Sequence, residues 1–118
     1  MKSKALCAEI EIYEKAISIL QNLQFPLHRV GFKQLAIAIS LFSKDNRQSM
    51  SKEIYPIIAN YWNCSNWRNI EHSIRIIILD AWIHRDQEEW DVYFPGIEKA
   101  PSNKCFIATI ATFIELRK

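Results

Sequence analysis

The sequence predicts an all-α fold of about six helices that includes a helix-turn-helix. Apolar residues recur three and four positions apart in nearly every segment, which places them on one face of a helix. Only two glycines and four prolines interrupt the 118 residues, of which 49% are hydrophobic and 24% charged. That composition is typical of a soluble globular domain. A chain of this length can bury a core of its own, so we expect residues 1–118 to form a single domain.

Two helices are expected in the first part of the chain. The first covers residues 4–23, and its apolar positions are Leu6, Ile10, Tyr13, Ile17 and Leu20. It ends at Phe25-Pro26, because the residue before a proline avoids helical geometry. The second opens at Gly31, and its apolar face consists of Phe32, Leu35, Ala36, Ile39 and Phe42. The polar run over residues 43–49 is expected to be a loop.

The helix-turn-helix is expected in the middle of the chain. Its first helix covers residues 54–62, with Pro56 either at the start of the regular helix or at a kink. Residues 63–66 form a polar turn rich in good helix caps. The clearest helix follows over residues 66–84, and its apolar positions are Ile70, Ile74, Ile77, Ile78, Ala81 and Trp82.

Two further helices complete the expected fold. A short helix around residues 88–93 is closed by Pro95-Gly96, and a last helix starts at Pro101-Ser102. The apolar positions of the last helix are Phe106, Ile110, Phe113 and Ile114. The core is expected to be built from Ile58, Ile74, Ile78, Trp82 and Phe106.

The net charge of +2 conceals an uneven distribution of charge. Residues 44–85 hold six lysines and arginines against four acidic residues, whereas residues 86–98 hold five acidic residues and no basic one. A basic face beside an acidic one is compatible with DNA binding, but many other proteins have the same pattern.

Several function classes are disfavoured. Cys7, Cys64 and Cys105 are an odd number at wide spacing, so we expect no disulfide framework and a cytoplasmic chain. No signal peptide and no membrane span is expected. His84-Arg85-Asp86 copies only the start of a kinase catalytic loop, without its asparagine or a glycine-rich loop. The spacing of Cys64, His72 and His84 fits no zinc pattern. We therefore expect no catalytic residues, metal, cofactor, membrane or small-molecule substrate.

The helix over residues 66–84 carries one strongly polar face. Arg68, Glu71, His72 and Arg75 lie three, four and seven positions apart, so their side chains share one side of the helix. Arginine suits guanine edges, and glutamate can accept a hydrogen bond from the cytosine amino group. A solvated face on an ordinary amphipathic helix has the same pattern, so the face alone leaves both interpretations open.

From Phe25 onward, several short motifs occur in the same order and with the same spacing as in a known family. They are Pro26-Leu27-His28, Gly31-Phe32, Ala38-Ile39-Ser40, residues 54–59 (similar to L-Y-P-x-I-A), residues 70–75 (similar to V-E-R-A-I-R), Ala81-Trp82, and residues 100–108 (similar to K-P-T-N-S-E-F-I-A). Over about 90 residues, the chain resembles the C-terminal DNA-binding effector domains of the stage 0 sporulation protein A response regulators. This resemblance covers residues 25–118, and residues 1–24 precede it as an N-terminal helix.

The resemblance implies which residues contact DNA. In that family the helix with V-E-R-A-I-R enters the major groove, and Glu71 and Arg75 match its glutamate and second arginine. His72 and Asn69 stand where the family has arginines, and the turn before the helix is one residue longer, so the target sequence is expected to differ. The candidate DNA-binding residues are Ser65, Asn66, Arg68, Asn69, Glu71, His72 and Arg75.

The resemblance implies a sequence-specific transcription regulator that binds double-stranded DNA, with two copies pairing on tandem half-sites. The alternative is a protein-interaction module of the same fold that has lost DNA binding and modulates a full-length regulator. The replacements at Asn69 and His72 favour that alternative, whereas Arg68, Glu71 and Arg75 on one face favour DNA. The 24 residues before the resemblance are too few for the receiver domain of the family, so we expect no phosphorylation switch in cis unless the chain is a fragment of a longer regulator.

Overall fold

The computed structural model describes residues 2–116, with side chains from residue 10 onward, and all regular secondary structure in this part of the chain is helical. Its elements are α1 (Lys2–Asn22), α2 (Val30–Lys44), the π-helical turn η1 (Met50–Ile54), α3 (Tyr55–Tyr61), α4 (Arg68–Ile83), α5 (Gln87–Tyr93) and α6 (Asn103–Leu116). The expected all-α class with six α-helices is confirmed. No helix in the described residues is both long enough and apolar enough to cross a bilayer.

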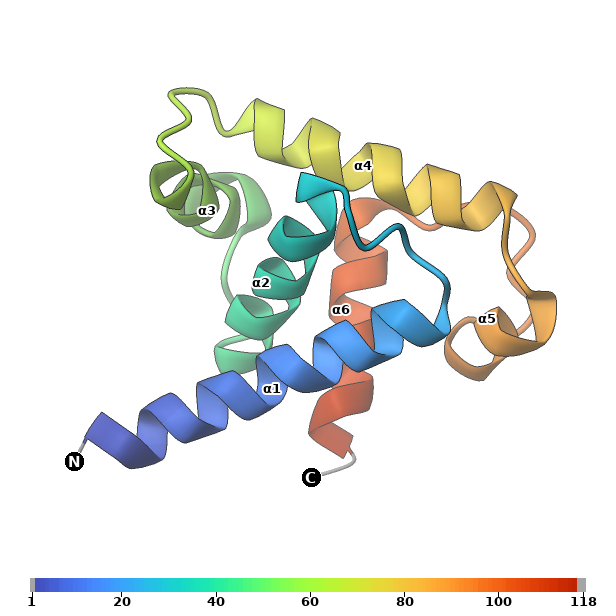
Figure 1. Ribbon diagram of the computed structural model, residues 1–118, viewed down its shortest axis with the longest axis horizontal. Helices are drawn as coiled ribbons and strands as arrows, with labels where there is room; N and C mark the ends of the chain where they lie inside the picture. Colours follow the sequence, from blue (N-terminus) through green and yellow to red (C-terminus); the bar gives the residue numbers. More distant parts are fainter. Residues whose placement is uncertain (1, 117–118) are drawn as a thin grey trace.

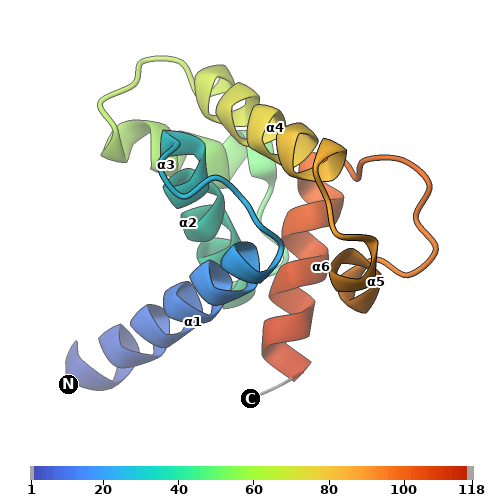
Figure 2. The same ribbon diagram turned by 45° about the vertical axis from the view of Figure 1, so that its right-hand side comes forward.

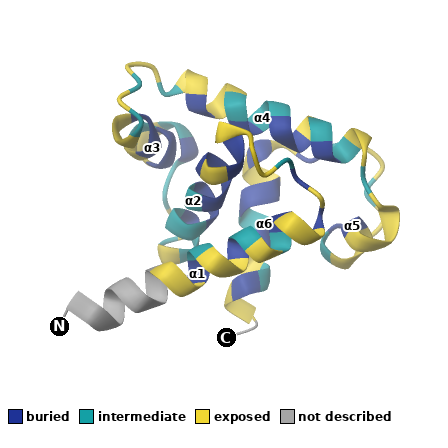
Figure 3. Ribbon diagram, in the orientation of Figure 1, coloured by how far each residue is buried: buried dark blue, intermediate teal, exposed yellow. Residues whose placement is uncertain are grey.

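Helix α2 is the central element of the fold. It packs against α1, α4, α6 and α3, and Figures 1 and 2 show α4 crossing over the upper ends of α2 and α6 while α1 crosses lower down. Its buried residues are Gly31, Phe32, Gln34, Leu35, Ala36, Ala38, Ile39 and Phe42. Figure 3 shows α2 as largely buried, whereas α4 exposes the side that faces away from α2. The polar face of α4 is therefore free to meet a partner.

The crossing of α2 and α4 is unusually close at Gly31. A Cβ atom at this position would lie 2.8 Å from the carbonyl oxygen of Ser73 and 3.1 Å from Cγ2 of Ile77. Contacts under 3.0 Å do not occur in relaxed structures, so only glycine allows the two backbones to approach this far. Ile74, Ile77 and Ile78 of α4 are then fully buried against the rest of the core.

Trp90 of α5 is the centre of an aromatic cluster. Its side chain is fully buried, and its ring lies 5.8 Å from that of Phe106 and 5.5 Å from that of Phe94. Phe25 stacks on it at 6.2 Å, which joins the end of α1 to α5 and α6. This cluster anchors α5, whose other residues are mostly polar.

The expected core is correct for Ile58, Ile74, Ile78 and Phe106, which are all fully buried. It is wrong for Trp82, which is only partly buried. Trp82 meets the edge of Trp90 at 5.6 Å, and the guanidinium of Arg85 lies over its ring at 3.7 Å. Helical periodicity correctly placed Trp82 on the side of α4 that packs against the core. It could not show that Trp90 of α5 would be the more deeply buried tryptophan.

Helix starts differ from the sequence expectation by about two residues, for identifiable reasons. Helix α4 begins at Arg68 rather than at residue 66, because Oδ1 of Asn66 accepts a hydrogen bond from the amide of Arg68 and holds the chain in a turn. Helix α6 begins at Asn103 rather than at Pro101, because Oγ of Ser102 accepts from the amide of Cys105 as a helix cap does. Pro56 lies at the start of α3, where its missing N–H is not needed.

Replacing Gly31 by alanine tests the close crossing. We expect Gly31→Ala to lower the free energy of unfolding by about 1–3 kcal/mol, the usual cost of overpacking. The better helix propensity of alanine, worth about 1 kcal/mol, offsets only part of this cost because the clashing atom belongs to the backbone. Urea unfolding measures the change, with Ser18→Ala on the exposed side of α1 as the control. A Gly31→Ala protein as stable as the wild type would contradict the close contact.

The two tryptophans of the cluster are expected to differ. Trp90→Ala should cost about 3–5 kcal/mol, as the loss of a large buried aromatic side chain does. Trp82→Ala should cost less, because the Trp82 side chain remains partly exposed. Urea unfolding of both variants gives the comparison, and a larger loss for Trp82→Ala would refute the assignment of Trp90 as the centre of the cluster.

Candidate nucleic-acid interface

A broad groove runs along the exposed face of α4. Three segments and Tyr55 of α3 line it: residues 46–51 at the end of the loop after α2 and the start of η1, the first half of α4, and residues 99–104 before and at the start of α6. Its volume of about 1310 Å³ exceeds the range of ordinary small-molecule pockets, and most of the residues that line it are polar or charged. These properties fit a large polar partner better than a small ligand.

The groove concentrates positive charge. Its charged lining residues are Arg47, Arg68, Arg75, Lys99 and Lys104 on the basic side and Glu71 on the acidic side. None of the five acidic residues between 86 and 98 lines it. Basic and acidic residues nearly cancel in the net charge of +2, but the fold places many of them on different surfaces. The groove therefore presents a basic surface suited to a polyanion.

The structure brings together four of the residues that the sequence selected. Arg68, Glu71 and His72 are exposed, and together with Arg75 they line the groove from α4. Arg75 differs from the other three, because it is half-buried and its Nη1 donates a hydrogen bond of 2.6 Å to the carbonyl oxygen of Pro101. Its guanidinium is therefore already engaged within the protein.

The other three selected residues lie in or beside the turn before α4. Ser65 and Asn66 precede the helix, and Oδ1 of Asn66 accepts a hydrogen bond from the amide of Arg68 within the turn. The side-chain amide of Asn69 donates to Sγ of Cys64 at 3.3 Å, and that thiol in turn contacts the carbonyl oxygen of Asn66 at 3.3 Å. Cys64, Asn66 and Asn69 thus hold the turn in one conformation. None of these three residues lines the groove.

Aromatic side chains support the start of α4. Trp67 stacks on the buried ring of Tyr55, with ring centres 6.0 Å apart and planes inclined by 15°. The guanidinium of Arg68 lies 4.9 Å from the centre of the Trp67 ring, a cation–π geometry. The stacked rings of Trp67 and Tyr55 therefore support the exposed side chain of Arg68.

Asn103 joins the start of α6 to α4. It is one of the few buried polar residues, and its Nδ2 donates to the carbonyl oxygen of Glu71 at 3.0 Å. Burial raises the pKa of the neighbouring Tyr55 phenol, and this effect outweighs a hydrogen-bonding interaction with Asn103 that lowers it. Asn103 and Arg75 together fasten residues 101–103 to two successive turns of α4.

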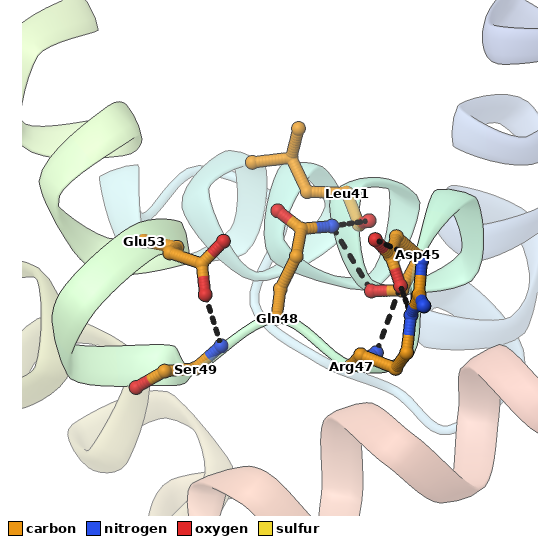
Figure 4. A network of polar contacts seen from close by, with 6 residues as sticks. All are labelled: Leu41, Asp45, Arg47, Gln48, Ser49 and Glu53. Atoms are coloured by element: carbon orange, nitrogen blue, oxygen red, sulfur yellow. Dashed lines mark hydrogen bonds and ion pairs between the residues drawn. The ribbon is translucent and has the colours of Figure 1, made fainter.

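The loop on the other side of the groove is held by its own polar contacts, shown in Figure 4. Nε2 of Gln48 donates to the carbonyl oxygens of Leu41, at 2.7 Å, and Asp45, at 3.0 Å. Arg47 pairs with Asp45 at 3.1 Å, and this hydrogen-bonded contact lowers the pKa of the Asp45 carboxyl group. The amide of Ser49 donates to the Glu53 carboxylate at 3.0 Å, which fixes the start of η1.

Sequence reasoning missed Arg47, Lys99 and Lys104 as groove residues. The excess of basic residues between 44 and 85 was a signal for Arg47, but no periodic pattern connects it to α4. Lys99 and Lys104 flank the Pro101-Ser102 helix start, and their proximity to α4 arises only from tertiary contacts over 26 and 32 residues.

Residues 16–114, which include all of α2 to α5, match the family described as Sporulation initiation factor Spo0A C terminal. The chain belongs to this family. The resemblance that the motifs suggested is thereby confirmed, and the chain is a DNA-binding domain of the sporulation-regulator class. No curated protein matches the sequence. Within the Spo0A C-terminal family fold, α3, the turn and α4 make up the helix-turn-helix, and the basic groove lies along its second helix.

The buried Tyr55 phenol gives a testable pH dependence. Its pKa is raised in the folded state, so the unfolded chain loses the proton first as the pH increases above about 10. The unfolded state then binds fewer protons, and the free energy of unfolding falls as the pH rises toward the folded pKa. Urea unfolding between pH 8 and 11 should show this fall, and Tyr55→Phe should reduce it. A Tyr55→Phe protein with the full wild-type loss would contradict the assignment.

Proposed function

We propose that the protein is a sequence-specific transcription regulator that reads double-stranded DNA by placing the first half of α4 in the major groove. The observation that carries the proposal is the exposed Arg68, Glu71 and His72 face of α4 within a basic groove. Membership of the Spo0A C-terminal family supports the same interpretation. A major groove about 12 Å wide admits one α-helix, and the N-terminal residues of a recognition helix contact the base edges.

The exposed residues of α4 have distinct roles in this proposal. Arg68 pairs with a guanine edge or a phosphate, because its guanidinium is exposed and carries donors suited to both. Glu71 gains nothing from phosphates, since like charges repel, so it discriminates between bases by accepting a hydrogen bond from an amino group. His72 lies one position further along the same face and contributes to base reading beside Glu71.

The turn residues act indirectly in the same proposal. Asn66 and Asn69 set the direction in which α4 leaves the turn, through their bonds to the Arg68 amide and the Cys64 thiol. Ser65 is exposed in the turn and contacts the DNA backbone. Residues 1–118 act as one DNA-binding domain in this view, two copies pair on tandem half-sites, and the interaction requires no cofactor.

Arg68→Ala and Glu71→Ala are expected to separate affinity from specificity. Arg68→Ala should weaken binding to both a selected and a scrambled duplex, and it should reduce the salt dependence by about one phosphate contact. Glu71→Ala should leave or raise the affinity for the scrambled duplex and relax the preference at one or two base pairs by about 1–3 kcal/mol each. Binding is measured by fluorescence anisotropy across a salt series, after the site has been selected from random DNA with the wild-type protein.

Arg29→Ala is the matched control, because Arg29 is also exposed but does not line the groove. It should bind both duplexes nearly as the wild type does. If Arg68→Ala and Glu71→Ala also bind like the wild type, the α4 face does not read DNA. If the wild-type protein selects no sequence and binds no duplex, the proposal fails and the protein-interaction module takes its place.

A further inference from the structure

We propose that Arg75 is a positioning residue for DNA binding: through its bond to Pro101 it holds residues 99–104 against α4, and thereby places Lys99 and Lys104 for contact with DNA phosphates. The inference rests on the proposed function and deepens it, because it assigns one wall of the groove to the DNA backbone. It also separates Arg75 from Arg68 and Glu71, although all three share one face of α4.

The environment of Arg75 favours a structural role within the protein over direct contact with DNA. Arg75 is half-buried, and Nη1 donates to the carbonyl oxygen of Pro101 at 2.6 Å, a short charge-assisted contact. Pro101 is itself buried, so its carbonyl has little access to solvent. Turning the guanidinium toward a base would leave this oxygen without its partner, and a buried acceptor without a partner is unfavourable.

The segment that Arg75 holds has little regular structure of its own. Residues 94–102 connect α5 to α6 without a helix, and they run past α4 before α6 begins. Arg75 contacts this segment at Pro101, and the carbonyl of Glu71, one turn earlier in α4, accepts from Asn103. These two bonds fix the segment to α4 at two points: Pro101 lies two residues after Lys99, and Asn103 lies directly before Lys104.

Lys99 and Lys104 are well placed to contact phosphates. Both side chains are exposed, and both line the groove together with Arg68 and His72. Phosphates on the DNA strand beside a recognition helix are the usual partners of lysines in such positions, and each contact releases counterions. If residues 99–104 were detached from α4, these two charges would no longer face the same duplex.

A mutant cycle distinguishes positioning from direct contact. The variants are Arg75→Gln, the Lys99→Gln/Lys104→Gln pair, and the triple variant, and the measured quantity is the slope of log Kobs against log salt concentration. The lysine pair should reduce the slope by about 1.8, at about 0.9 for each phosphate contact. Arg75→Gln alone should reduce it by nearly as much, and the triple variant by no more than the lysine pair.

A direct phosphate contact by Arg75 gives a different result. Arg75→Gln would then reduce the slope by only about 0.9, and the triple variant by about 2.7, because independent contacts add. That additive outcome would overturn the inference. Arg29→Gln, which removes an exposed arginine outside the groove, controls for the general effect of charge and should change the slope little.

A measurement without DNA separates this inference from the proposed function. Amide hydrogen exchange of residues 99–105 should become faster in Arg75→Gln than in the wild type, while the core of α2 stays protected. Arg75→Met, which keeps the buried aliphatic stem but has no donor, replaces Arg75→Gln if circular dichroism shows that the latter is unfolded. Unchanged exchange would refute the positioning role. Faster exchange in a protein that binds no DNA would instead show that the proposed function had failed, and the assignment of the lysines to phosphates with it.

Discussion

The close contact between α2 and α4 at Gly31 is the constraint on which the orientation of the exposed α4 face depends. With no side chain at this position, the start of α2 approaches the backbone of α4 at Ser73. Ile70, Ile74, Ile77 and Ile78 are then buried on one side of α4, which leaves the opposite side of the helix for its polar residues. Arg68, Glu71 and His72 must therefore face outward, whatever they bind.

Polar contacts around the groove stabilise its walls rather than leaving them mobile. The turn before α4 is held by Cys64, Asn66 and Asn69, and the loop after α2 by Gln48 and the pair of Asp45 with Arg47. An exposed ion pair such as Asp45 with Arg47 contributes little to stability, but it restricts where the guanidinium can lie. Side chains that are already restricted lose less conformational entropy when a partner binds. A basic groove with ordered walls therefore suits a stiff partner such as duplex DNA.

Helical periodicity made most of the fold predictable, because burial repeats with the period of the helix. It located all six helices, and the wheel of α4 correctly placed Arg68, Glu71 and His72 outside the core. It could not find Lys99 or Lys104, since they lie in and beside an irregular segment whose position depends on bonds spanning 26 and 32 residues. The choice between Trp82 and Trp90 also depended on how α5 packs, and no local pattern encodes that packing.

The two departures from the family motif affect different parts of the site. Asn69 stands where the family has an arginine just before the motif. The side chain of Asn69 donates a hydrogen bond to Cys64 in the turn. This replacement therefore removes a charged group and adds a contact that orders the turn. His72 remains exposed within the groove, where an imidazole stands in place of the guanidinium of the family motif. Contacts to phosphates supply affinity and contacts to bases supply discrimination. Under the proposed function, a chain with these two replacements keeps the basic walls of the groove, and we expect its preferred DNA sequence to differ at the position that His72 faces.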